Sequence, residues 1–320
     1  MKDWKVFFNK IKKESISEYK KIVSVVLGSY NRLDFLKLTI DSIRTECKDL
    51  SHEIIVVDGG SSDGTLQWLV EQKDIITIVQ HNRGEWLGKN IERRSWGYFM
   101  NLAFKCAQGK FVCMLSDDCL LVPGAILNGV KLVEENLQHG KKIGAVAFYW
   151  RNWSQQEKYY VCFTLGNKIY VNHGMYLNQA LKEVDYIDED NFFFYNGDGD
   201  LCLKIWHAGY ECIESPNSFV EHYPHASVDV RKTNYQKYNQ DLKNYLKKWD
   251  GIFYDKKLNN LGMLIEREFE DKTKTGERFN FLHNQIIANN PKLIKPASVF
   301  KKIKQQIYWK FKAVVRRLFN

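Results

Sequence analysis

Two adjacent carboxylates, Asp117 and Asp118, follow a short apolar run that ends at Leu115. Like charges a few ångströms apart cannot both stay ionised cheaply, so such a pair favours a nearby cation, for which a divalent metal ion is the natural candidate. Because successive strand residues point to opposite sides, the two carboxylates would serve different partners. We expect Asp118 to bind the metal and Asp117 to bind another part of a ligand. Taken alone, a pair of this kind is more often a solvated turn or a helix cap.

A third carboxylate, Asp58, also ends an apolar run and is followed by two glycines. Glycines let the backbone approach a ligand closely, and the carboxylate could accept a hydrogen bond from a base or a ribose. The residues after the first apolar run would add a further wall to the same crevice: Ser29, Tyr30, Asn31 and Arg32. Tyr30 could line a base, and Arg32 could approach a phosphate. Two acidic strand ends at one sheet edge favour a binding site over two ordinary turns.

Strands and helices alternate in the part of the chain that carries these residues. Short apolar runs predict strands over Ile22–Leu27, Glu53–Val57, Ile75–Val79 and Lys110–Leu115. Apolar residues at helical spacing predict helices over Leu33–Cys47, Thr65–Gln72 and Trp96–Ala107. The alternation predicts a doubly wound α/β sheet, whose ligands bind beyond the carboxyl ends of the strands.

The pattern changes in the second half of the chain. A strand over Ile143–Tyr149 is followed by mixed, aromatic-rich sequence from Arg151 to Asp190, which we expect to form β-rich insertions beside the site. A helix is expected over Gly199–Ala208 and a short strand over Glu211–Ile213. Beyond Asp229 the chain becomes rich in Lys and Asn and is predicted to be largely helical.

Four segments in this order resemble the family 2 glycosyltransferases of the GT-A fold: Val23–Arg32, Glu53–Thr65, Ser116–Ile126 and Asn196–Tyr210. The resemblance extends from Ile22 to Ser227, about two thirds of the chain. Four motifs in the right order are far more specific than any one of them. The resemblance implies a Rossmann-like, doubly wound mixed sheet flanked by helices, a nucleotide-sugar donor and inverting transfer to an acceptor.

The resemblance also implies roles for individual residues. Asp58 would contact a uracil or thymine ring, and Asp117 and Asp118 would bind the ribose and the metal. Asp198 falls where the family places its catalytic base, although Gly197 stands where the family usually carries Glu.

Inverting transfer needs one base to take the proton of the acceptor hydroxyl and one cation to hold the departing diphosphate. Asp198 and an ion bound by Asp118 would meet these two needs. Asp200 is a second candidate base, but its place at the start of a predicted helix favours stabilisation of the helix N-terminus.

His222 lies where family members often carry a histidine that reaches the metal or the diphosphate. A structural role is the equal alternative for His222, and His225 is a weaker candidate ligand. A histidine ligand would favour Mn²⁺ over Mg²⁺, because imidazole suits softer ions and Mg²⁺ prefers oxygen. Arg93 and Arg94 either clamp the diphosphate, whose oxygens the guanidinium fork matches, or belong to a solvated basic loop.

The composition is that of a folded globular protein, with 320 residues of which 44% are hydrophobic. Seven cysteines without a CxxC pair favour neither a disulfide framework nor a zinc site, and they suit a reducing cytoplasm. Residues 1–21 lack the apolar core of a secretory signal. No apolar run in the sequence approaches the roughly 20 residues that a spanning helix needs. We therefore expect a cytoplasmic protein.

The net charge of +9 is unevenly distributed. Residues 292–320 carry nine Lys and Arg and no acid, whereas the body of the chain is slightly acidic and has no recognisable nucleic-acid-binding module. We therefore expect no nucleic-acid partner. Apolar residues recur every three or four positions in this tail, which predicts an amphipathic helix on an anionic membrane surface. Packing of the tail on the body or on a partner is the alternative.

The sequence thus predicts four parts: a basic amphipathic segment at 1–21, a GT-A domain at 22–230, a helical extension at 231–291 and a basic tail helix at 292–320. The expected function is metal-dependent transfer from a UDP- or dTDP-sugar to a glycan or a lipid-linked acceptor. Such a reaction would serve cell-surface polysaccharide synthesis at the cytoplasmic face of the membrane. A catalytically inactive nucleotide-sugar-binding partner is one alternative, and a nucleic-acid-binding protein is a weaker one.

Overall fold

The computed structural model describes residues 21–224, 233–255 and 263–289. The predicted basic segment at 1–21 (except residue 21), the tail at 292–320 and His225 lie outside this part of the chain. The structure forms two compact units, divided between Gly276 and Glu277. The sheet and the site belong to the first unit, and α10 (Asn280–Asn289) belongs to the second.

Four parallel strands form the first half of the sheet: β1 (Lys21–Ser29), β2 (His52–Asp58), β3 (Ile75–Val79) and β6 (Gly109–Met114). β1 pairs with β2 on one side and with β6 on the other, and β2 pairs with β3. β1, β2 and β6 are largely apolar and buried because helices cover both faces of the sheet, whereas β3 at the edge is partly exposed. Their shared direction brings Ser29, Asp58 and the residues after Met114 to one edge.

The sheet continues with strands of mixed direction in the order β12-β9-β8-β10-β6-β1-β2-β3. The additional strands are β7 (Cys119–Leu121), β8 (Ile143–Asn152), β9 (Tyr159–Cys162), β10 (Gly174–Leu177), β11 (Glu211–His222) and β12 (Leu264–Arg267). β10 is antiparallel to both β6 and β8, whereas β11 is parallel to β8 and antiparallel to β7. A separate hairpin joins β4 (Glu85–Trp86) to β5 (Lys89–Asn90).

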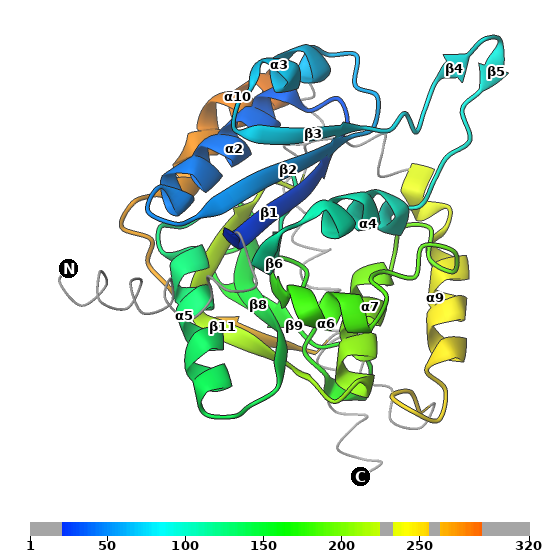
Figure 1. Ribbon diagram of the computed structural model, residues 1–320. Coiled ribbons are helices and arrows are strands. Elements are labelled where there is room, and N and C mark those ends of the chain that lie inside the picture. Colours follow the sequence, from blue (N-terminus) through cyan, green and yellow to red (C-terminus); the bar gives the residue numbers. More distant parts are fainter. Residues whose placement is uncertain (1–20, 225–232, 256–262, 290–320) are drawn as a thin grey trace, which may run out of the picture. The chain divides into compact units, whose positions relative to one another are not determined.

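Helices pack on both faces of this sheet (Figure 1). One hydrophobic core joins the strands to α2 (Leu33–Cys47), α3 (Thr65–Glu71) and α5 (Ala125–Gln138). The opposite core joins them to α4 (Trp96–Cys106), α6 (Asn178–Glu183) and α7 (Gly197–His207). Within β1, Val25 and Leu27 face the first core and Val26 faces the second, as the two-residue period of a strand requires.

The second half of the chain differs from the prediction in three places. α7 begins at Gly197 instead of Gly199, so that Asp198 lies in its first turn. β11 continues to His222 and was predicted only as far as Ile213. The extension at 231–291 is not wholly helical: it contains α9 (Tyr238–Lys248) but also β12, which pairs with β9 and covers that edge of the sheet. Among the helices of the described residues, none is both long and apolar enough to cross a bilayer.

Candidate active site

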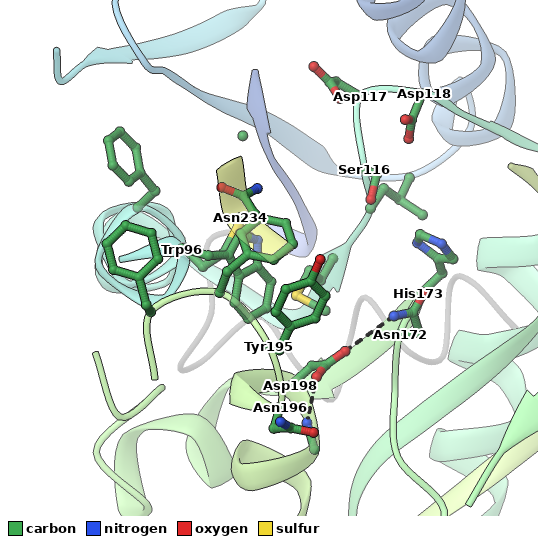
Figure 2. A pocket seen from close by; sticks show the side chains of 18 of the residues that line it. Trp96, Ser116, Asp117, Asp118, Asn172, His173, Tyr195, Asn196, Asp198 and Asn234 are labelled. Atoms are coloured by element: carbon green, nitrogen blue, oxygen red, sulfur yellow. Dashed lines mark hydrogen bonds between the residues drawn. The ribbon is translucent and has the colours of Figure 1, made fainter. Parts of the chain in front are cut away.

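A cavity of about 830 Å³ opens at the carboxyl ends of β1 and β6. Its volume is within the range of small-molecule sites, and its position is the one expected for ligands of an α/β sheet. Figure 2 shows Asp117 and Asp118 above the cavity and Asp198 below it. Of the predicted site residues, the wall contains Ser29, Tyr30, Arg32, Arg93, Arg94, Asp117, Asp118, Asp198 and His222. The structure therefore brings together nine side chains from separate parts of the sequence.

The cation beside the carboxylate pair is the guanidinium group of Arg32. Its Nη1 atom lies 2.6 Å from Asp117 Oδ1 and 3.0 Å from Asp118 Oδ2. The Ser29 hydroxyl donates to the other oxygen of Asp117 at 2.8 Å. Burial lowers the pKa of Arg32, but the charges of Asp117 and Asp118 outweigh it and raise that pKa above its ordinary value. Burial raises the pKa of the Asp117 carboxyl, and the charge of Arg32 opposes that shift.

Replacing Arg32 by Gln should destabilise the fold strongly. The side chains of Asp117 and Asp118 are only 4% and 3% exposed, and breaking a buried ion pair costs about 3–5 kcal/mol because it leaves an uncompensated charge. The matched control is Arg44→Gln, which breaks a much more exposed pair with Asp74 and should cost about 1 kcal/mol or less. Chemical denaturation measures both free energies of unfolding. Equal losses in the two variants would show that Arg32 is not the essential counter-ion.

Sheet register places His222 beside the carboxylate pair. β11 and β7 pair His222 with Cys119, the residue that follows Asp118. The Nε2 atom of His222 lies 3.6 Å from Asp118 Oδ1, and its Nδ1 lies 2.7 Å from Asn152 Oδ1. Because an amide oxygen only accepts hydrogen bonds, Nδ1 carries the proton in this arrangement and Nε2 is the nitrogen that faces Asp118.

These residues fit a divalent metal in donor type and orientation. A carboxylate oxygen and an imidazole nitrogen face each other, and the second nitrogen of the imidazole is fixed by an outer partner, as is usual for metal-binding histidines. Within residues 21–224, 233–255 and 263–289, no cluster of three or more His, Cys, Asp or Glu could hold an ion by itself. Asp118 and His222 are the residues that would hold a divalent ion at this place.

Two predicted donor-binding residues, Asp58 and Asn31, do not line the cavity. Asp58 is fully buried, and its carboxylate accepts hydrogen bonds from Gly60 N, Ser61 N and Ser61 Oγ at 2.9, 2.8 and 2.6 Å. Asn31 exchanges hydrogen bonds with Ser61 and Ser62. Both side chains organise the loop after β2 in this structure, while Gly59 of the same loop does line the cavity. A contact between Asp58 and a base stays a prediction.

Besides Arg32, three arginines line the cavity: Arg83, Arg93 and Arg94. Arg83 lies over the ring of Tyr30, with 5.4 Å between the guanidinium carbon and the ring centroid. Arg93 donates from Nη2 to Asn234 at 2.9 Å, and its buried Nε has no hydrogen-bond acceptor among the described residues. Burial lowers the pKa of Arg93, and the nearby positive charge of Arg83 lowers it further. Because these arginines are positively charged and Arg93 has a hydrogen-bond donor to offer, this part of the wall suits an anion such as a diphosphate.

Asp198 lies in the first turn of α7, where the preceding Asn196 adopts a left-handed backbone conformation with φ of 63°. The carboxylate accepts from Gly199 N at 2.8 Å and from Asn172 Nδ2 at 3.2 Å (Figure 2). A Cβ atom at Gly199 would lie 2.9 Å from the Tyr245 hydroxyl, so a larger residue there would force the buried Tyr245 side chain to shift. Burial raises the pKa of Asp198, and the hydrogen bonds of Gly199 and Asn172 oppose that shift. A carboxylate with a raised pKa is a stronger base than a solvated one.

Replacing Asn172 by Ala should move the acid limb of any activity that uses Asp198 as a base. The Asn172 amide favours the charged carboxylate, so its loss raises the pKa of Asp198 further. The deprotonated fraction then falls at a higher pH, and activity is lost earlier as pH decreases. The pH profile of kcat/KM reports the pKa of the free enzyme and is the measurement to make. An acid limb at the wild-type position would exclude this role of Asn172.

The cavity wall also contains polar residues that were not predicted from the sequence, among them Arg83, Asn172 and His173. His173 is buried, its ring nitrogens lie 3.7–3.8 Å from Cys119 Sγ, and burial lowers its pKa well below the usual value. Arg83 belongs to the same basic loop as Arg93 and could have been included on that ground. Asn172 and His173 are isolated polar residues in a β-rich insertion, and their sequence context carries no signal.

The comparison with known proteins agrees with the fold. The family described as glycosyl transferase family 2 matches residues 24–175, which include the carboxyl ends of β1, β2 and β6. The chain thus carries a domain of glycosyl transferase family 2, with the GT-A fold. The predictions of the family and of the fold are confirmed.

Individual relatives are more distant. A protein of Bacillus subtilis (strain 168) named as the teichuronic acid biosynthesis glycosyltransferase TuaG is 30% identical over 111 residues, which cover 32% of this chain. The chain spans 38% of the length of that relative. The mannosyltransferase PcManGT of Pyrobaculum calidifontis, solved with GDP-Man and Mn²⁺, has a TM-score of 0.52 at 18% identity. That similarity covers 78% of this chain and 73% of PcManGT, and it shows a shared fold.

A second solved structure, S. aureus TarS 1–349, has a TM-score of 0.45 at 15% identity. The aligned part covers 72% of each chain. A TM-score this low carries no structural conclusion for the site.

Proposed function

We propose that this protein is an inverting glycosyltransferase that moves a sugar from a UDP- or dTDP-sugar to a hydroxyl of a glycan or lipid-linked acceptor. The observation that carries the proposal is one cavity with a carboxylate pair on one side and the half-buried Asp198 on the other. Transfer needs a place for the leaving diphosphate and a base for the acceptor proton, and these two groups are suited to those needs. The alignment with family 2 supports the same assignment.

The donor would lie along the wall formed by β1 and the arginine loop. The Tyr30 ring can stack on the nucleobase, and Arg83 already lies over that ring. Arg93 and Arg94 can donate to the diphosphate oxygens, for which the guanidinium fork is suited. Asp117 and Asp118 would hold the ribose and a divalent ion, which neutralises charge on the departing diphosphate when bound.

Asp198 would act at the sugar itself. As the acceptor oxygen forms its bond to the anomeric carbon, the bond from that carbon to the diphosphate oxygen breaks and its electron pair leaves with the nucleotide diphosphate. The Asp198 carboxylate takes the hydroxyl proton in the same step. Attack opposite the leaving group inverts the anomeric configuration. Asn172 would hold the carboxylate in place through its 3.2 Å hydrogen bond.

The choice of metal follows from His222. If His222 Nε2 joins Asp118 as a ligand, Mn²⁺ is preferred, because Mg²⁺ favours an all-oxygen shell. PcManGT was solved with Mn²⁺, which supports this preference by analogy of fold.

The acceptor and the location rest on the sequence of the C-terminal tail. A basic amphipathic helix at 292–320 would hold the protein on the anionic cytoplasmic face of a membrane, where a lipid-linked acceptor of cell-surface polysaccharide synthesis is exposed. The name of TuaG supports a polysaccharide product. Deleting residues 296–320 should abolish partition onto anionic liposomes, and unchanged partition would exclude the anchor.

Titration of the protein with UDP-, dTDP- and GDP-sugars, with Mn²⁺, Mg²⁺ or EDTA, tests the donor assignment. Calorimetry should show binding of a uridine or thymidine diphosphate sugar that weakens in EDTA. Failure of every donor to bind folded protein would exclude the proposed function.

A catalytically inactive nucleotide-sugar-binding partner is the second candidate. The observation in its favour is Gly197, which stands where the family usually has Glu. The ring of Trp96 lies 3.4 Å from the position that a Cβ atom would take there. Donor binding without any turnover would select this candidate.

A further inference from the structure

The segment just before Asp198 is held by a carboxylate from another helix. The backbone amides of Phe193, Phe194 and Tyr195 all donate to the side chain of Asp241, at 3.0, 2.9 and 2.8 Å. Asp241 lies in the first turn of α9 and is only 2% exposed. Three charge-assisted hydrogen bonds from consecutive amides fix the course of a backbone segment that has no regular secondary structure.

This segment leads directly into the first turn of α7. Asn196 follows Tyr195 and starts α7 in a left-handed conformation, and Asp198 comes two residues later. Figure 2 shows the ring of Tyr195 in the cavity, above Asp198. A shift of residues 193–195 would therefore be passed on to the carboxylate and to the wall beside it.

The same helix, α9, also holds the chain on the other side of Asp198. Asp200 is fully buried and pairs with Lys248 Nζ at 2.9 Å, and it accepts from Trp249 Nε1 at 2.9 Å. The sequence predicts that Asp200 stabilises the helix N-terminus, and the structure adds a buried ion pair with α9. α9 and the residue that follows it therefore contact the chain on both sides of Asp198. Asp241 binds the segment before it, and Lys248 and Trp249 bind Asp200, which comes after it.

We propose that Asp241 is a positioning residue for Asp198, so that α9, which lies outside the segment matched by family 2, sets the geometry of proton transfer. This inference rests on the proposed role of Asp198 as the base. A displacement of about 1 Å in a reacting group can cost about 10²-fold in rate, even when the altered residue is remote from the chemistry. Asp241 acts mainly on the orientation of the base. It reaches the donor wall only indirectly, through Phe193, whose ring centroid lies 5.0 Å from the guanidinium carbon of Arg93.

The variant Asp241→Asn tests this role, because it keeps the shape but leaves one acceptor oxygen and turns an NH₂ group toward amide donors. We expect kcat to fall at least about tenfold while the affinity for the donor changes by less than about twofold. Amide hydrogen exchange over residues 193–199 should accelerate at least about tenfold, because the three hydrogen bonds that protect the segment are weakened.

Asp271→Asn is the matched control. The Asp271 carboxylate also accepts from backbone amides, those of Thr273 and Thr275 at 2.9 and 2.7 Å, but it does not line the cavity. This variant should leave kcat and exchange over residues 193–199 at the wild-type level. Asp241→Glu, which restores the charge with a longer side chain, should recover part of the lost kcat if the carboxylate matters.

The possible results separate this inference from the proposed function. Wild-type kcat in Asp241→Asn, or exchange unchanged over residues 193–199, would overturn the positioning role. A parallel loss of kcat and of donor affinity would also overturn it, since that result indicates a general collapse of the cavity. Absence of turnover in the wild type would refute the proposed function, and the exchange measurement would still decide whether Asp241 orders the segment.

Discussion

Replacing Asp198 by Asn should abolish sugar transfer while leaving donor binding intact. The amide cannot take the proton of the acceptor hydroxyl, and a positioned general base typically contributes about 10²–10⁴-fold to a rate. Gly199 N and Asn172 Nδ2 donate to different oxygens of the Asp198 carboxylate, so the single oxygen of Asn can keep one of these hydrogen bonds. Because the two side chains have the same shape, the local structure should persist. Initial rates of nucleotide release with acceptor present measure the loss, and calorimetry measures the affinity for the donor.

The exposed carboxylate Asp74, which pairs with Arg44 and does not line the cavity, provides the control for this change. Asp74→Asn should keep the wild-type rate. A rate for Asp198→Asn within about threefold of the wild type would show that another group takes the proton. Asp200 is a poor candidate for that group, because Lys248 and Trp249 occupy both of its oxygens.

Replacing Asp118 by Ala should weaken the metal-dependent part of donor binding. Asp118 faces His222 through one oxygen and Arg32 through the other. Its loss would therefore remove a proposed metal ligand and one of the two carboxylates that pair with Arg32. Contacts to charged groups contribute about 1.5–3 kcal/mol, which corresponds to at least about tenfold in affinity. Calorimetric titration with the donor sugar, in Mn²⁺ and in EDTA, separates the metal-dependent part of the binding free energy from the part that does not need the metal.

The isosteric variant Asp118→Asn is the control for shape in this experiment. It should resemble Asp118→Ala in Mn²⁺, because charge and not volume binds the ion, and it should resemble the wild type in EDTA. An equal loss of affinity in Mn²⁺ and in EDTA would contradict the metal role and would indicate that Asp118 only holds Arg32 in place.

The parallel half of the sheet was predictable because its strands are continuous apolar runs: β1, β2 and β6 are largely buried, and the edge strand β3 is partly exposed but rich in β-branched residues. Continuous runs of β-branched residues indicate such strands, and the observed β3 and α2 have the predicted bounds. β11 was predicted too short, since Glu211–His222 contains Pro216 and several polar residues and is irregular between Ser215 and Phe219. β12 is four residues long and depends on a partner about a hundred residues away, which no local pattern shows.

The candidate site was predictable as a set of residue types at strand ends, but its internal contacts were not. The sequence indicates that Asp117 and Asp118 need a cation, yet it does not show that Arg32, 85 residues before Asp117, provides one. Asp241 is a single acid in a Lys- and Asn-rich helix, and its role depends on a contact with a loop that is 46 to 48 residues away. Tertiary contacts of this kind have no sequence period and become visible only in the folded chain.

The most direct test of the central claim is turnover: nucleotide release from UDP-, dTDP- and GDP-sugars, with Mn²⁺ or Mg²⁺ and a lipid-linked or glycan acceptor, together with NMR of the anomeric proton in the product. The account predicts release from at least one uridine or thymidine donor, loss of release in EDTA, and an anomeric configuration opposite to that of the donor. Folded protein that binds a donor but never releases its nucleotide, or a product with retained configuration, would contradict it.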